Sequence, residues 1–205
     1  MLGCEPFTPE QEKMLLDYFK GKKYAERNIA LLTFGIQTGF RIAEILSLKI
    51  GDVLKQGRIV DKVYVQRSNM KGGKSTEKKV YGRSMILAQR TKESLQTLIN
   101  SMECKDPDQY LFKGNRGGNT PFCTRSVWRL LSESSKGLGI TSKIGTHSMR
   151  KTFANRVYQN LLDKNNADAL RIVQAGLGHD NINNTIKYLS FREEALTEAI
   201  SDVFD

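Results

Sequence analysis

The chain contains two histidines, and the first of them, His147, stands three residues before Arg150. On a helix this spacing places both side chains on one face. An imidazole and a guanidinium that point the same way can hold a phosphate oxygen between them. The candidate chemistry is therefore phosphate binding, although an ordinary surface pair at the start of a helix fits the same spacing.

The second histidine, His179, follows Gly178 and stands nine residues before Tyr188. The glycine indicates a tight reversal of the chain that brings the histidine to the start of a helix. Taken alone, Tyr188 fits a helix tyrosine with a buried ring and a hydroxyl in contact with water. The combination of the histidine and the phenol is what makes this segment a candidate for chemistry.

A further arginine has a candidate partner close by in the sequence. Gly39 allows the chain to turn, Arg41 then opens a helix near its positive end, and Glu44 follows one turn later, where it can orient the guanidinium. A local salt bridge fits the same pattern. Lys71 and Lys74 stand at the expected tip of a hairpin, where lysines are either solvated or bind phosphates.

Helices must position most of these groups. Thr8 is the expected N-cap of the first helix, with Pro9 at its first position and Gln11 closing a capping box. Apolar residues at helical spacing predict further helices at about 24–38, 41–48, 88–102 and 124–135, and helices dominate from there to the end.

Short strands interrupt the helices in the first half of the chain. Short runs of β-branched and aromatic residues at 59–60, 63–65 and 80–81 predict strands, and a glycine-containing turn at 70–74 joins them. The sequence therefore predicts an α+β, mostly α-helical fold with one small antiparallel β-sheet.

The composition fits one folded domain with a nucleic-acid partner. The 205 residues suffice for a large hydrophobic core. Thirty-two Lys and Arg against 22 Asp and Glu leave a net charge of +10, which favours a polyanion, although a solvated basic face also fits. No stretch reaches the ~18 apolar residues that span a bilayer, so we expect a cytoplasmic location and no membrane partner. Three cysteines without a CxxC pair predict reduced thiols rather than a zinc site.

Three segments of the chain resemble the motifs of the tyrosine recombinases, also called the phage integrase family. TGFRIAE at 38–44 resembles the first arginine box of the family, and THSMRKTFA at 146–154 resembles its HxxR box. LGH at 177–179, with Thr185 and Tyr188, resembles the closing box that carries the nucleophile. The resemblance covers almost the full chain, with the motifs in the order of the family.

The resemblance implies a tyrosine recombinase catalytic-domain fold and a defined set of site residues. The implied catalytic residues are Arg41, Lys71, His147, Arg150, His179 and Tyr188, and Glu44 and Lys74 support them. The implied reaction is site-specific integration, excision or inversion of double-stranded DNA through a 3′-phosphotyrosine, without ATP, metal or cofactor. The implied assembly is a homotetramer on DNA, with accessory DNA-bending proteins as further partners.

Two departures from the family qualify this transfer. The segment at 79–82 lacks the proline that commonly follows the hairpin lysine, so the choice of Lys71 over Lys74 stays open. The resemblance begins at Phe7, so we expect residues 1–205 to be a single catalytic domain without the N-terminal core-binding domain. The chain is then similar either to the fimbrial inversion recombinases, which use a catalytic domain alone, or to a portion of a longer integrase.

The C-terminal stretch and the reaction type leave alternatives open. Residues 191–205 are predicted to form an amphipathic tail that packs either on a neighbouring protomer or on its own domain. A type IB topoisomerase shares the phosphotyrosine chemistry but relaxes supercoils. A DNA-binding regulator could keep the scaffold without the reaction, although such a protein needs no nucleophile.

Overall fold

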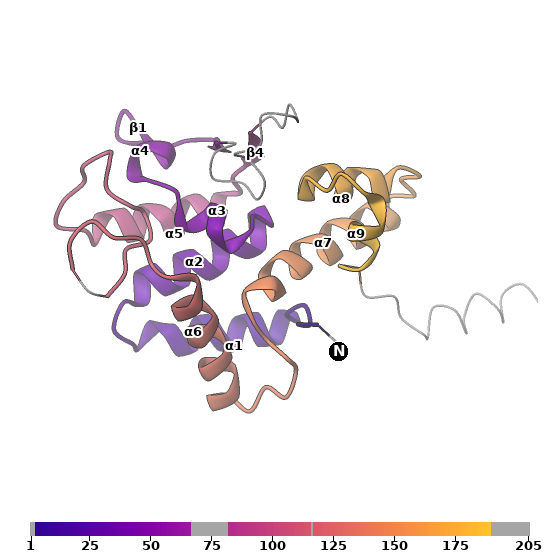
Figure 1. Ribbon diagram of the computed structural model, residues 1–205, viewed down its shortest axis with the longest axis horizontal. Helices are drawn as coiled ribbons and strands as arrows, with labels where there is room; N and C mark the ends of the chain where they lie inside the picture. The colour runs from indigo at the N-terminus through magenta and orange to yellow at the C-terminus, as the bar shows by residue number, and fades with distance from the viewer. Residues whose placement is uncertain (1–2, 67–81, 116, 190–205) are drawn as a thin grey trace, which may run out of the picture. The chain divides into compact units, whose positions relative to one another are not determined.

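The computed structural model describes residues 3–66, 82–115 and 117–189 (Figure 1). The chain divides into two compact units, Met1–Phe153 and Ala154–Asp205. The first unit contains α1 (Pro9–Lys20), α2 (Ala25–Thr38), α3 (Ile42–Leu46), α4 (Ile50–Val53), α5 (Gln89–Asn100) and α6 (Thr124–Gly137). Helix α7 (Thr146–Asp163) runs across the boundary, and α8 (Ala169–Leu177) and α9 (Ile182–Ile186) belong to the second unit.

The start of α1 confirms the predicted capping box. The Thr8 hydroxyl accepts a hydrogen bond from the Gln11 backbone N–H at 3.2 Å, and the Gln11 side chain accepts one from the Thr8 N–H at 3.2 Å. Pro9 occupies the first helical position, where its missing N–H costs nothing. The helix ends at Lys20, and Gly21 is its C-cap.

Helix α2 forms the centre of the first unit and packs against α1 and α5 (Figure 1). It is apolar over most of its length, and Leu31, Leu32 and Phe34 are almost completely buried. The ring of Phe34 lies 6.0 Å from that of Phe40 and 6.1 Å from that of Phe112. This aromatic cluster extends the core from α2 into the turn that follows the helix.

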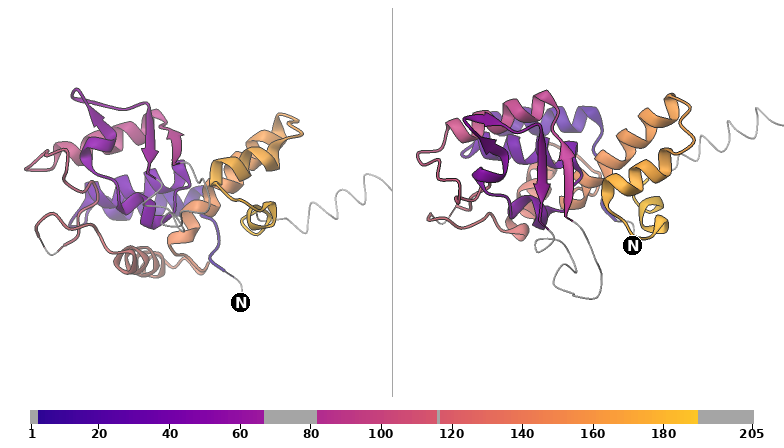
Figure 2. Two further views of the ribbon diagram at one scale, coloured as in Figure 1. Left: turned by 45° about the horizontal axis from the view of Figure 1, so that its top comes forward. Right: turned by 90° about the horizontal axis from the view of Figure 1, so that it is seen from above.

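Within the described residues the strands form two small sheets, whereas the sequence predicts a single sheet. β1 (Leu54–Lys55) pairs antiparallel with β2 (Arg58–Ile59), and β3 (Lys62–Val65) pairs antiparallel with β4 (Arg83–Ile86) (Figure 2). A bend at Asp61 separates β2 from β3, so the two ladders do not merge. The predicted strand at 80–81 and the turn at 70–74 lie outside the described residues.

The start of α7 approaches α2 closely because a glycine of α2 and the glycine that caps this helix face two large side chains. A Cβ placed on Gly35 would lie 2.4 Å from the Met149 sulfur. A Cβ on Gly39 would lie 2.4 Å from the Phe153 ring, and Gly39 has a φ of +58°. Both pairs repeat at a spacing of four residues, so the backbones of the two helices meet over one turn.

We expect Gly39→Ala to lower the free energy of unfolding by about 3 kcal/mol. The left-handed conformation penalises a side chain, and the added methyl overlaps the Phe153 ring. Urea denaturation of the two chains measures the difference. Gly21→Ala is the matched control, because that cap has a φ of −94° and nothing lies within 4 Å of the added Cβ. Equal losses in the two variants would contradict the close approach.

The second unit is built around a tight reversal between α8 and α9. Gly178 ends α8 with a φ of 62°, a conformation that glycine adopts without strain. Val173 and Leu177 are buried on the inner side of α8, which packs against α9. The reversal that the sequence predicts is therefore present, and it places His179 between the two helices.

Three further features of the described residues concern disulfides, membrane-spanning helices and clusters of metal-binding side chains. Cys4, Cys104 and Cys123, which all lie in the described part of the chain, form no disulfide there. Over residues 3–66, 82–115 and 117–189, no helix combines the length and the apolar character needed to cross a membrane. Within these same ranges, no three side chains of His, Cys, Asp or Glu gather in the manner of a metal site.

Candidate active site

The turn after α2 brings Arg41 to the start of α3. Gly39 caps α2 in the left-handed conformation, and Phe40 is buried against Phe34. Arg41 then adopts an extended conformation as the N-cap of α3. A buried ring on one side of Arg41 and a helix on the other fix the backbone from which the guanidinium extends.

Glu44 orients Arg41, as the sequence predicts. One carboxylate oxygen of Glu44, Oε2, accepts a hydrogen bond from the Arg41 backbone N–H at 2.8 Å. The other, Oε1, accepts one from the Arg41 guanidinium at 3.0 Å. The Glu44 side chain is 1% exposed and that of Arg41 is 31% exposed. A buried carboxylate thus holds a guanidinium whose outer part reaches solvent.

The first turn of α7 carries His147 and Arg150. A hydrogen bond closes the first turn of this helix: the Ser148 hydroxyl accepts from the backbone N–H of Gly145, the residue before the helix, at 3.1 Å. Arg150 is 2% exposed, and its Nη1 donates to the Gly39 carbonyl oxygen. This bond joins the HxxR box to the turn that presents Arg41, so the structure brings these two predicted motifs together within the first unit.

Arg83 of β4 lies beside these groups, and sequence reasoning missed it. Its Nη2 lies 3.6 Å from Glu44 Oε2, and its guanidinium lies 4.4 Å from the centre of the Phe40 ring. Burial and the charge of Arg150 lower the pKa of Arg83 to about 9, against the pull of Glu44. Arg83 belongs to none of the recognised motifs. Its contacts to Phe40 and Glu44 join positions about 40 residues apart, so local spacing does not predict them.

His147 lies in a positively charged environment. Partial loss of hydration, followed by the charges of Arg150, Arg41 and Lys151, lowers the pKa of His147 from its usual value of 6.5. The imidazole keeps an exposed surface. Near neutral pH it is therefore an uncharged ring at the edge of an arginine cluster, a state that suits a proton acceptor.

A titration followed by NMR should show the pKa of His147 below 6.5. Because the unfolded chain then binds more protons than the folded chain, the free energy of unfolding falls as the pH drops through about 6.5. Comparison with His147→Gln identifies the resonance and should show a flatter dependence of stability on pH. A midpoint at or above 6.5 in dilute buffer would contradict the positive surroundings of this ring.

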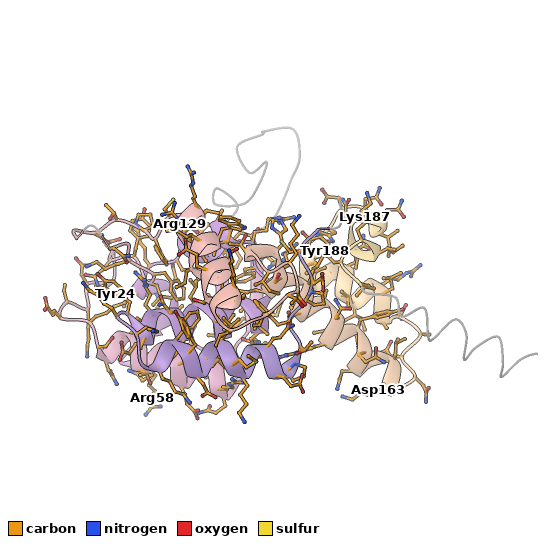
Figure 3. All side chains as sticks on the ribbon, turned by 90° about the horizontal axis from the view of Figure 1, so that it is seen from below. Tyr24, Arg58, Arg129, Asp163, Lys187 and Tyr188 are labelled. Carbon is orange, nitrogen blue, oxygen red and sulfur yellow. The ribbon has the colours of Figure 1, made fainter. Side chains whose placement is uncertain are left out.

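His179 and Tyr188 both belong to the second unit, and Figure 3 labels Tyr188. Their ring centres lie 5.2 Å apart in an edge-to-face arrangement. His179 Nδ1 lies 3.0 Å from the hydroxyl of Thr185, which is fully buried, so this bond sets the orientation of the imidazole. The Asn155 side chain donates to the Tyr188 carbonyl oxygen at 2.9 Å. Tyr188 as a whole residue is partly exposed.

The predicted site residues thus form two described groups. Arg41, Glu44, His147 and Arg150 cluster in the first unit, and His179 and Tyr188 cluster in the second. Lys71 and Lys74 lie outside the described residues.

Comparison with known proteins identifies the family. Residues 5–194 match the phage integrase family. The tyrosine recombinase XerA of Pyrococcus furiosus is 28% identical over 194 residues, which cover 94% of this chain and 59% of that protein. The chain therefore spans about three fifths of this relative.

Solved structures show the same fold. The crystal structure of XerA recombinase aligns with a TM-score of 0.71 at 25% identity, covering 98% of this chain and 65% of that chain. The XerH site-specific recombinase, in a post-cleavage complex with a palindromic difH substrate, aligns with a TM-score of 0.70 at 23% identity, covering 96% of this chain and 52% of that one. The mostly helical fold with small antiparallel sheets is thus confirmed. With the family match over residues 5–194, these findings show that the chain belongs to the phage integrase family of tyrosine recombinases.

Proposed function

We propose that this chain is a site-specific recombinase that breaks and rejoins double-stranded DNA through a covalent 3′-phosphotyrosine at Tyr188. The observation that carries the proposal is the cluster of positive groups in the first unit. Buried Glu44 holds the Arg41 guanidinium there, and Arg150 is bonded to the Gly39 carbonyl in the turn that presents Arg41. Such a set favours a bound phosphate. The net charge of +10 and the DNA complex of the similar XerH protein support DNA as its source.

Each site residue has a role in this proposal. Attack on a phosphodiester gathers negative charge on the nonbridging oxygens, and Arg41 and Arg150 stabilise it with paired hydrogen bonds. His179 donates a further hydrogen bond to the same oxygens. His147 accepts the proton of the phenol or orients the phosphate, and an ordinary phenol needs such help because its pKa is about 10.

The leaving 5′-oxygen takes a proton from Lys71, with Lys74 as the alternative acid. The bond from phosphorus to this oxygen breaks as the bond from phosphorus to the Tyr188 oxygen forms. A 5′-hydroxyl of a second DNA strand then attacks the phosphotyrosine, which releases the phenol and restores a phosphodiester without ATP. We propose that residues 1–205 act as one catalytic domain on DNA in a homotetramer, with accessory DNA-bending proteins. The cytoplasmic location, the inversion subtype and the packing of the tail at 191–205 stay predictions.

Capture of covalent complexes from fragmented genomic DNA tests the proposal, and it requires no defined target sequence. The chain is incubated with random fragments, denatured and recovered with any attached DNA, which is then sequenced. We expect recovered DNA to share a common sequence and to be linked through its 3′-phosphate to the peptide that contains Tyr188. DNA binding without any adduct would instead support the regulator, and relaxation of supercoiled DNA of any sequence by a monomer would support the topoisomerase.

A further inference from the structure

Arg83 is a buried arginine that reaches from β4 into the turn after α2. Its backbone pairs with Val65 at one end of the β3–β4 ladder, and its side chain is 9% exposed. The guanidinium stacks over the Phe40 ring at 4.4 Å and approaches Glu44 Oε2 at 3.6 Å. Two segments far apart in the sequence thus converge on one carboxylate.

The surroundings of Arg83 are unfavourable for a cation in the free protein. Burial removes its hydration, and the nearby charges of Arg150 and Arg41 repel it, which together lower its pKa to about 9. An arginine buried beside two others is weak as a stabilising contact, because the cost of removing it from water offsets the attraction to its carboxylate. This arrangement is more typical of a site that receives an anion.

The contacts of Glu44 explain how Arg83 can act at a distance. A carboxylate is rigid and planar, so a cation beside one oxygen also fixes the direction of the other. Arg83 and the Arg41 N–H both lie at Oε2, while Oε1 accepts the hydrogen bond from the Arg41 guanidinium. Movement of Oε2 therefore displaces the atom that orients the Arg41 side chain.

We propose that Arg83 is a positioning residue of the phosphate site, which holds the Glu44 carboxylate and thereby Arg41 in the geometry that receives a phosphate. The inference rests on the proposed function, since it assumes that the arginine cluster binds phosphate. It adds a residue outside the three motif boxes.

Arg27 provides a matched control for the proposal. It is also buried, it stacks over the Phe122 ring at 4.0 Å, and burial lowers its pKa to about 10. Its guanidinium donates to the Lys113 carbonyl and the Asn115 side chain, at 2.9 and 2.6 Å. Replacement of Arg27 thus removes a buried, stacked arginine without changing the partners of Glu44.

The experiment uses inorganic phosphate as the probe and the full chain as the protein. Side-chain Nε–H resonances of ¹⁵N-labelled arginines report both phosphate affinity and the mobility of Arg41. We expect Arg83→Met to weaken phosphate binding about tenfold and to increase the mobility of Arg41, with Arg83→Lys intermediate. Arg27→Met should leave both within about twofold of the original chain. In a Glu44→Gln background the effect of Arg83→Met should fall below about twofold, because the link to Arg41 is already broken.

The outcomes separate this proposal from the proposed function. If Arg41→Ala weakens phosphate binding while Arg83→Met leaves affinity and Arg41 mobility unchanged, Arg83 is not a positioning residue and the phosphate site stands. The role is also overturned if Arg83→Met weakens phosphate binding equally in the original chain and in the Glu44→Gln background. Arg83 would then act on phosphate without Glu44 as an intermediary. If the original chain shows no response to phosphate, the phosphate site itself fails, and the role of Arg83 fails with it.

Discussion

Tyr188→Phe is expected to abolish covalent attachment to DNA while leaving DNA binding within about twofold. The substitution removes one oxygen atom, which is the proposed nucleophile, and keeps the ring that packs edge-to-face on His179. Without the oxygen no phosphotyrosine can form, so the effect is a complete loss rather than a reduced rate. A denaturing gel with a nicked form of the captured DNA site measures the adduct, and a gel-shift assay measures binding.

Tyr158→Phe is the matched control for this experiment. Tyr158 lies on α7 within the same unit and is also partly buried. The Tyr158→Phe variant should form the covalent adduct with DNA at the rate of the original chain. Adduct formation by Tyr188→Phe, with the DNA attached to another residue, would show that the nucleophile has been assigned wrongly.

The second large effect is expected from the two arginines of the cluster. Arg41→Ala or Arg150→Ala should raise the barrier to cleavage by about 3 kcal/mol, which corresponds to a rate lower by a factor of about 10². Each guanidinium is held before the substrate arrives, Arg41 by Glu44 and Arg150 by the Gly39 carbonyl, so each is a preorganised donor. Single-turnover cleavage rates of the captured site measure this loss.

A charge-matched variant separates chemistry from general attraction to DNA. Arg58 is exposed on β2, and Arg58→Ala removes the same charge from the protein (Figure 3). We expect this variant to change the cleavage rate by less than about threefold at saturating protein, because screened surface charges mainly affect affinity. Arg41→Lys should recover little activity, since an ammonium lacks the planar pair of donors. Equal losses from Arg58→Ala and Arg41→Ala would argue against the phosphate site.

Local features of the fold were predicted from the sequence because their causes are local. The capping box of Thr8 and Gln11 and the turns at Gly39 and Gly178 depend on residues within a few positions of one another. The Arg41–Glu44 pair is of the same kind, since a spacing of three on a helix brings two side chains together. The order of the helices followed from apolar spacing in the same way.

Contacts between distant segments were not predictable in this manner. The bond from Arg150 to the Gly39 carbonyl joins residues 111 positions apart, and it depends on the close approach of α7 to α2. The split of the strands into two sheets follows from a bend at Asp61 that leaves no periodic signal. One amino-acid sequence by itself does not reveal such pairings.

The sequence by itself therefore determined the family motifs, the helical framework and the types of residue that chemistry requires. The tertiary structure decided which of these residues share one positively charged environment, and it added Arg83 to them. Local pairs are predictable from the sequence because hydrogen bonds within one helical turn depend only on the spacing of the residues. The burial of Glu44 between Arg41 and Arg83, by contrast, exists only after α2, α3 and β4 have packed around one core.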